Sequence, residues 1–182
     1  MNITVYLASA YGNDESFVKA VRLFGTWIGK NGHRLIYGGS KCGLMGELAQ
    51  SVLNNGGQVI GVEPELFVKR GLLYDEIDEL IVTKDIAERR RKMIELGDAF
   101  IAFPGGTGTL EEISEVISMV SLKELDAPCI VCNLNGYYDD LKRQLWKMVD
   151  SGLSSREKLS GVFFADSAEE VIRIVENAFQ SD

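Results

Sequence analysis

The sequence predicts an α/β fold in which helices cover both faces of a mostly parallel β-sheet. Short apolar runs alternate with helical patterns along the 182 residues. The apolar runs are nearly continuous, as in strands that are buried on both faces. No internal repeat or Pro/Ser-rich linker interrupts this order, and the length suits one domain. We therefore expect a single Rossmann-like domain over residues 1–182, with three layers in the order α/β/α.

Each expected strand is a short run of apolar and β-branched residues, and the runs between them have helical period. The strands are expected at residues 3–8, 34–37, 58–62, 79–83, 99–103, 129–132 and 162–164. The helices are expected at residues 14–30, 44–54, 85–97, 110–122, 138–150 and 167–179. Several boundaries have chemical causes: Asn31-Gly32 stops the first helix, and Ser167 with Glu170 forms a capping box at the last. Residues 64–78 have mixed polarity and little period, which predicts an exposed loop or lid.

The overall charge argues against a nucleic-acid partner, because the formal net charge is −8 and the pI is about 4.8. No apolar stretch approaches the roughly 20 residues needed to span a membrane, and no leader pattern opens the chain. Cys42, Cys129 and Cys132 lack zinc-ligand spacing, and His33 is the one imidazole. We therefore expect a cytoplasmic protein without a metal site, a disulfide framework or a membrane anchor.

A glycine-rich turn follows the strand expected at residues 99–103 and precedes a helical pattern. Glycines let the backbone pass close to a ligand, and the free N–H groups at a helix start favour an anion. A phosphate site is therefore predicted on the backbone of Gly105, Gly106, Thr107, Gly108 and Thr109. A second turn, containing Gly38 and Gly39, also joins a strand to a helix, and both turns are expected at the same edge of the sheet.

The helix expected at residues 85–97 carries an arginine on its apolar face. Ile86, Arg89, Met93 and Leu96 are spaced three and four residues apart, and Arg90 lies one step round. Arg89 alone could extend along the surface or pair with a carboxylate. With an anion site expected nearby, a ligand-facing Arg89 is favoured, with Arg90 and Met93 as further substrate contacts.

Glu112 has two interpretations. Thr109 and Glu112 match a capping box, in which both side chains satisfy backbone donors at the helix start. A phosphate at the same helix end would repel such a carboxylate and raise its pKa, so a protein that tolerates the conflict can use Glu112 in chemistry. Glu111 is expected to face solvent.

These motifs together resemble those of the Lonely Guy (LOG) family of cytokinin-activating phosphoribohydrolases, whose members are often mislabelled lysine decarboxylases. Residues 104–112 match P-G-G-x-G-T-x-x-E in full, and residues 88–93 are similar to E-R-K-x-x-M. Residues 37–46 are similar to Y-G-G-G-x-x-G-L-M-G, and residues 135–138 to D-G-Y-Y. The resemblance covers most of the chain, to about Tyr138.

The resemblance implies that Arg89 and Glu112 are the catalytic pair. It also implies hydrolysis of the N-glycosidic bond of AMP or N6-modified AMP to a free base and ribose 5-phosphate. No cofactor is expected, and the protein is expected to form a homodimer or a larger homo-oligomer. Ser9 is included among the substrate contacts. The sequence differs from the family pattern at Ala8, Ser40, Ala87, Met119 and Ser121. The differences at Met119 and Ser121 leave open which N6 group the substrate carries.

Two alternatives stay open at this point. The first is a nucleotide-binding or nucleotide-cofactor carrier without catalysis. The second, a lysine decarboxylase, is disfavoured because the sequence has no recognisable lysine context for a pyridoxal Schiff base.

Overall fold

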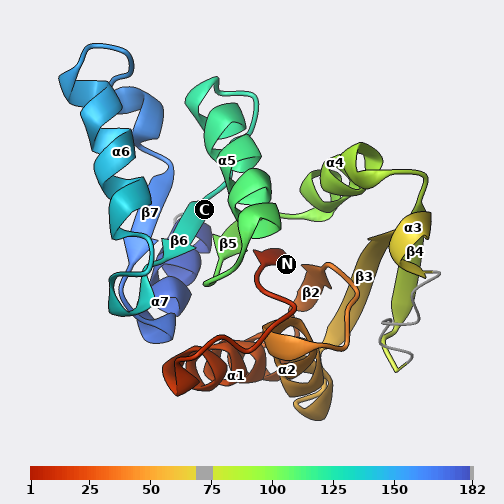
Figure 1. The fold of residues 1–182 in the computed structure, drawn as a ribbon. Coiled ribbons are helices and arrows are strands. Elements are labelled where there is room, and N and C mark those ends of the chain that lie inside the picture. The colour runs from red at the N-terminus through yellow and green to blue at the C-terminus, as the bar shows by residue number, and fades with distance from the viewer. Residues whose placement is uncertain (69–75, 181–182) are drawn as a thin grey trace.

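The computed structural model describes residues 1–68 and 76–180, and these contain a seven-stranded parallel sheet (Figure 1). The strands are β1 (Asn2–Tyr6), β2 (Arg34–Tyr37), β3 (Gln58–Pro64), β4 (Glu79–Thr83), β5 (Ala99–Ala102), β6 (Cys129–Cys132) and β7 (Val162–Ala165). Their order across the sheet is β4-β3-β2-β1-β5-β6-β7. The predicted α/β fold with a parallel sheet is confirmed.

The helices form a layer on each face of the sheet (Figure 1). One layer holds α1 (Glu15–Lys30), α2 (Gly43–Asn54) and α7 (Ala168–Phe179), and the other holds α4 (Ile86–Leu96), α5 (Thr107–Ser121) and α6 (Asp139–Asp150). Alternate residues of β1 serve the two cores: Val5 packs toward α1 and α2, whereas Tyr6 packs toward α4 and α5. Among the described residues, no helix is long and apolar enough to cross a membrane.

The direction in which strands are added reverses at β1. Strands β2 to β4 extend from one side of β1, and β5 to β7 extend from the other, where Ile3 pairs with Ala99. The loops that follow the carboxyl ends of β1 and β5 therefore turn away from each other. Open α/β sheets bind ligands at such a switch point.

Two sequence-based assignments need correction, the start of α5 and the segment 64–78. Helix α5 begins at Thr107 rather than at residue 110, because the backbone of Gly106 takes the N-cap position. The segment 64–78 is not wholly a loop: Pro64 ends β3, and a short helix α3 (Glu65–Val68) follows. The rest of the proposed lid, residues 69–75, lies outside the described residues.

The apolar face expected for residues 85–97 is also partly wrong. Arg89 and Met93 are buried as predicted, but Ile86 is exposed at the start of α4. Asp85 caps this helix by accepting a hydrogen bond from the Glu88 N–H at 2.8 Å. The first turn of α4 is therefore exposed, and only the following turns bury one face of the helix.

Candidate active site

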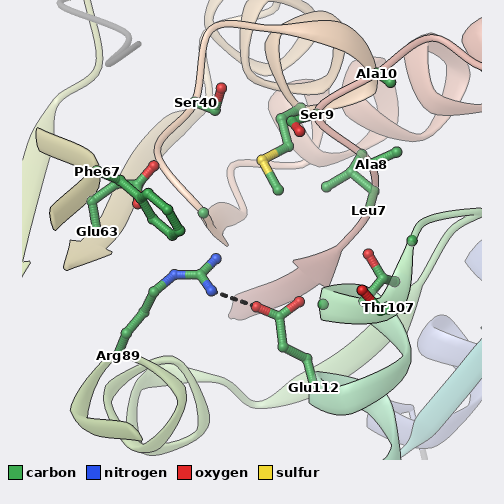
Figure 2. Close-up of a pocket in the computed structure, with 15 residues that line it drawn as sticks. Leu7, Ala8, Ser9, Ala10, Ser40, Glu63, Phe67, Arg89, Thr107 and Glu112 are labelled. Atoms are coloured by element: carbon green, nitrogen blue, oxygen red, sulfur yellow. Dashed lines mark hydrogen bonds and ion pairs between the residues drawn. The ribbon is translucent and has the colours of Figure 1, made fainter. Parts of the chain in front are cut away.

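A cavity of about 500 Å³ lies beyond the carboxyl ends of the central strands (Figure 2). It is lined by the loop after β1, by the glycine turn after β2, by the end of β3 and α3, and by the turn that begins α5. The lining residues are 7–10, 38, 40, 45, 63, 67, 89, 106–109 and 112. The two glycine turns predicted to flank one ligand do lie on the same cavity.

Arg89 and Glu112 meet in this cavity. The Arg89 Nη1 donates a hydrogen bond to the Glu112 Oε1 at 2.6 Å, and its Nε donates to the Val62 carbonyl at 2.9 Å. The side chains are only 11% and 6% exposed. Burial raises the pKa of the Glu112 carboxyl, and the Arg89 guanidinium opposes part of that rise. The pair is therefore a carboxylate with raised proton affinity beside a fixed positive charge.

The glycines after β2 make room for charged side chains. A Cβ on Gly38 would lie 2.6 Å from the Arg89 Nη2, and one on Gly39 would lie 2.6 Å from the Cγ of Glu63. Gly39 also has a φ of +81°, a conformation that L side chains rarely adopt. Together these two glycines allow Arg89 and Glu63 to reach the cavity.

The turn before α5 presents backbone N–H groups to the cavity. The first intrahelical bond runs from the Leu110 N–H to the Gly106 carbonyl at 3.0 Å, so the N–H groups of residues 107–109 precede it. Gly106 and Gly108 have open space around their Cα atoms, whereas a Cβ on Gly105 would clash with Thr109. This geometry is that of an anion site at a helix start.

The capping box, which was one of the two interpretations of Thr109 and Glu112, is absent. Gly106 is the N-cap, and no side chain caps α5. Thr109 is instead buried at the third helical position, and Glu112 lies further along the helix with Arg89 as its partner. Glu111 faces solvent as predicted.

The two tyrosines of the N-G-Y-Y segment donate hydrogen bonds to the backbone of the turn between β5 and α5. The Tyr137 hydroxyl donates to the Gly105 carbonyl at 2.6 Å, and the buried Tyr138 hydroxyl donates to the Phe103 carbonyl at 2.9 Å. The Ala8 N–H donates to the Pro104 carbonyl at 3.3 Å and so joins the loop after β1 to the same turn. These contacts fix the backbone between β5 and α5.

The remaining predicted substrate contacts divide into two groups. Ser9 lines the cavity from the loop after β1. The cavity is not lined by the other four, which are Gly39, Arg90, Met93 and Gly105. Met93 lies in the core under α4, and Arg90 forms ion pairs with Glu111 at 2.7 Å and Glu115 at 2.6 Å on α5.

Sequence reasoning missed Glu63, Phe67, Ser40 and Met45 as lining residues. Glu63 stands near the end of β3, and burial raises its pKa to about 7, with Arg89 lowering it and Glu112 raising it. A single acidic residue within an otherwise apolar strand was the available signal. In residues 1–68 and 76–180, no cluster of three or more His, Cys, Asp or Glu side chains is arranged to hold a metal ion.

Several known proteins share the sequence or the fold of this chain. The solved molybdenum cofactor binding protein from Rippkaea orientalis superposes with a TM-score of 0.73 at 22% identity, over 97% of this chain and 95% of that one. The molybdenum cofactor carrier protein from Chlamydomonas reinhardtii gives a TM-score of 0.72 at 21% identity, over 99% and 98% of the two chains. At this identity, the likeness concerns the fold alone.

Sequence matches identify the family. A family model described as "Possible lysine decarboxylase" matches residues 45–175. The cytokinin riboside 5'-monophosphate phosphoribohydrolase LOG1 of Arabidopsis thaliana is 37% identical over 96% of this chain and 82% of its own length. The cytokinin riboside 5'-monophosphate phosphoribohydrolase of Rhodococcoides fascians is 40% identical over 77% of this chain and 71% of its own length. The chain therefore belongs to the Lonely Guy (LOG) family of phosphoribohydrolases.

Proposed function

We propose that the protein hydrolyses the N-glycosidic bond of AMP or N6-modified AMP, releasing an adenine-type base and ribose 5-phosphate. One observation carries this proposal: the Arg89–Glu112 pair lies in the same cavity as the free N–H groups at the start of α5. The names of the relatives described above supply the substrate class.

The phosphate would bind to the backbone N–H groups of residues 107–109, and this remote binding would position the ribose. Glu112 is then placed to act on the ribose, one turn further along α5. Its carboxylate would take a proton from the attacking water while the sugar passes through an oxocarbenium-like transition state. Arg89 keeps its proton, so its work is electrostatic, on the substrate or the departing base.

The test is incubation of the purified protein with AMP and with isopentenyladenosine monophosphate, with free base and ribose 5-phosphate followed by chromatography. Glu112→Gln is the control, because it keeps the shape of the side chain and removes the base. We expect the variant to bind nucleotide and to turn over at least roughly a hundredfold more slowly. Tight binding of intact nucleotide by the wild type, without product, would favour a nucleotide carrier instead.

We also propose that the protein works as a homodimer or larger homo-oligomer in the cytoplasm. Leu122, Met148 and Leu153 are exposed, and a second cavity of about 390 Å³ lies between α5 and α6 next to the first two of them. The three cysteines are free thiols, which suits a reducing compartment. Light scattering coupled to size exclusion would measure the oligomer, and a mass equal to 20.1 kDa would contradict it.

A further inference from the structure

Glu63 is a buried acid that points into the cavity from the side opposite the start of α5 (Figure 2). Its side chain belongs to β3, whose other inner residues are apolar, and the residue is only 5% exposed. Its carboxyl group makes no hydrogen bond to any residue in the ranges 1–68 and 76–180. A mostly buried carboxyl without a hydrogen-bond partner is costly for the fold, so its position in a ligand cavity calls for a chemical explanation.

The cavity has a direction that follows from the phosphate site. Thr107, at the start of α5, lies at one end, Glu112 follows, and Arg89 lies between Glu112 and Glu63 (Figure 2). A nucleotide whose phosphate is at the start of α5 and whose ribose is beside Glu112 would extend its base toward Glu63. Phe67 lies beside Glu63 (Figure 2) and offers apolar surface for a purine ring, and Met45 also lines the cavity.

The departing base needs a proton source. A purine that leaves as an anion is a poor leaving group, and protonation of a ring nitrogen makes it leave as a neutral base. Among the described lining residues, the titratable side chains are Arg89, Glu112 and Glu63. Arg89 does not give up its proton, and Glu112 is assigned to the attacking water.

We propose that Glu63 is the general acid that protonates the departing base, an inference that rests on the proposed hydrolase function. The C1'–N9 bond breaks and its electron pair goes to the base. The Glu63 proton moves to a ring nitrogen of that base. Water forms the new bond to C1' and gives its proton to Glu112, and solvent exchange then returns the proton from Glu112 to Glu63.

The environment of Glu63 suits this role near neutral pH. Burial raises its pKa to about 7, Arg89 on α4 opposes the rise, and Glu112 on α5 adds to it. A catalytic acid is most effective when its pKa lies near the working pH. Glu63 can therefore be protonated before reaction and ionised after it.

The experiment compares two leaving groups in wild type, Glu63→Gln and a matched control, Glu65→Gln, whose side chain is exposed at the start of α3. The substrates are AMP, whose base needs a proton, and 4-nitrophenyl riboside 5-phosphate, whose phenolate leaves without one. For Glu63→Gln, we expect kcat/KM to fall at least about thirtyfold with AMP and less than about threefold with the nitrophenyl substrate. Glu65→Gln is expected to match wild type with both.

Equal losses with both substrates would overturn the assignment, and so would full activity of Glu63→Gln on AMP. The wild-type pH profile tests it without any variant: kcat/KM for AMP should fall above about pH 7, whereas that for the nitrophenyl substrate should lack this limb. A shared limb would also contradict the proposal. If the wild type hydrolyses neither substrate, the proposed function itself fails, which is a separate outcome.

Discussion

The guanidinium of Arg89 and the carboxylate of Glu112 form a buried ion pair between two neighbouring helices. Their atoms approach to 2.6 Å although the residues are 23 apart in sequence. The same guanidinium donates to the Val62 carbonyl, so Arg89 joins α4 to both α5 and β3. The pair therefore combines a structural contact with the proposed chemistry.

The first prediction concerns the stability of this pair. Arg89→Met leaves Glu112 buried without its partner, so we expect the free energy of unfolding at pH 8 to fall by about 3 kcal/mol. Arg89→Met combined with Glu112→Leu should recover most of this loss, because a buried pair can be replaced by apolar side chains. Urea unfolding measures both. Arg90→Met is the matched control, since the partly exposed Arg90 pairs should cost under about 1 kcal/mol.

The second prediction concerns Gly38. A Cβ at this position would lie 2.6 Å from the Arg89 Nη2 and 3.1 Å from the Met45 Cε, so Gly38→Ala must displace the guanidinium. We expect kcat for AMP to fall by about tenfold to a hundredfold, because small misplacements of catalytic groups are costly. Wild-type kinetics in this variant would show that the exact position of Arg89 does not limit the reaction.

The third prediction uses two adjacent tyrosines. Tyr138→Phe removes a buried hydrogen bond to the Phe103 carbonyl and should lower the free energy of unfolding by about 1–2 kcal/mol. Tyr137→Phe removes a bond to the Gly105 carbonyl at an exposed position, where water can replace the hydroxyl, and should cost under about 0.5 kcal/mol. Chemical unfolding of the two variants tests the difference, and equal values would contradict it.

The fourth prediction concerns the pH dependence of stability. Burial raises the pKa of Glu63 from 4.5 to about 7 in the folded protein. The folded state therefore holds this proton more tightly, and the stability it contributes is complete below about pH 4.5 and lost as the pH rises to about 7. Glu63→Gln stays neutral, so its free energy of unfolding should exceed that of wild type by on the order of 1–2 kcal/mol at pH 8. Near pH 4.5 the two proteins should match.

The fold and much of the site could be predicted because their signals are local. Apolar runs and helix stops place the boundaries of most helices and strands to within a few residues. Glycine turns at two strand ends indicate that both turns lie at the same edge of the sheet. Arg89 stood out because a charge on an apolar helical face is visible in the sequence alone. The structure buries Arg89, as its place on that face indicates.

The differences between the sequence patterns and the structure have tertiary causes. Thr109 and Glu112 matched a capping box, but the cap position went to Gly106, and Glu112 found a partner on another helix. Glu63 was missed because the alternation of side chains along a buried strand does not show whether its last residues face the hydrophobic core or a cavity. Arg90 was included with Arg89 because of its neighbouring position, yet its partners on α5 draw it away from the cavity.

The reversal of strand order at β1 also affects when the protein can first bind a nucleotide during its synthesis. Ser9 and Gly38 leave the ribosome early, but the backbone that would hold the phosphate begins beyond β5, which pairs with β1. An N-terminal nascent chain that ends before β5 lacks both that turn and Glu112. Nucleotide therefore cannot assist folding of the first half of the chain, and any stabilisation by ligand begins only after β5 has joined β1.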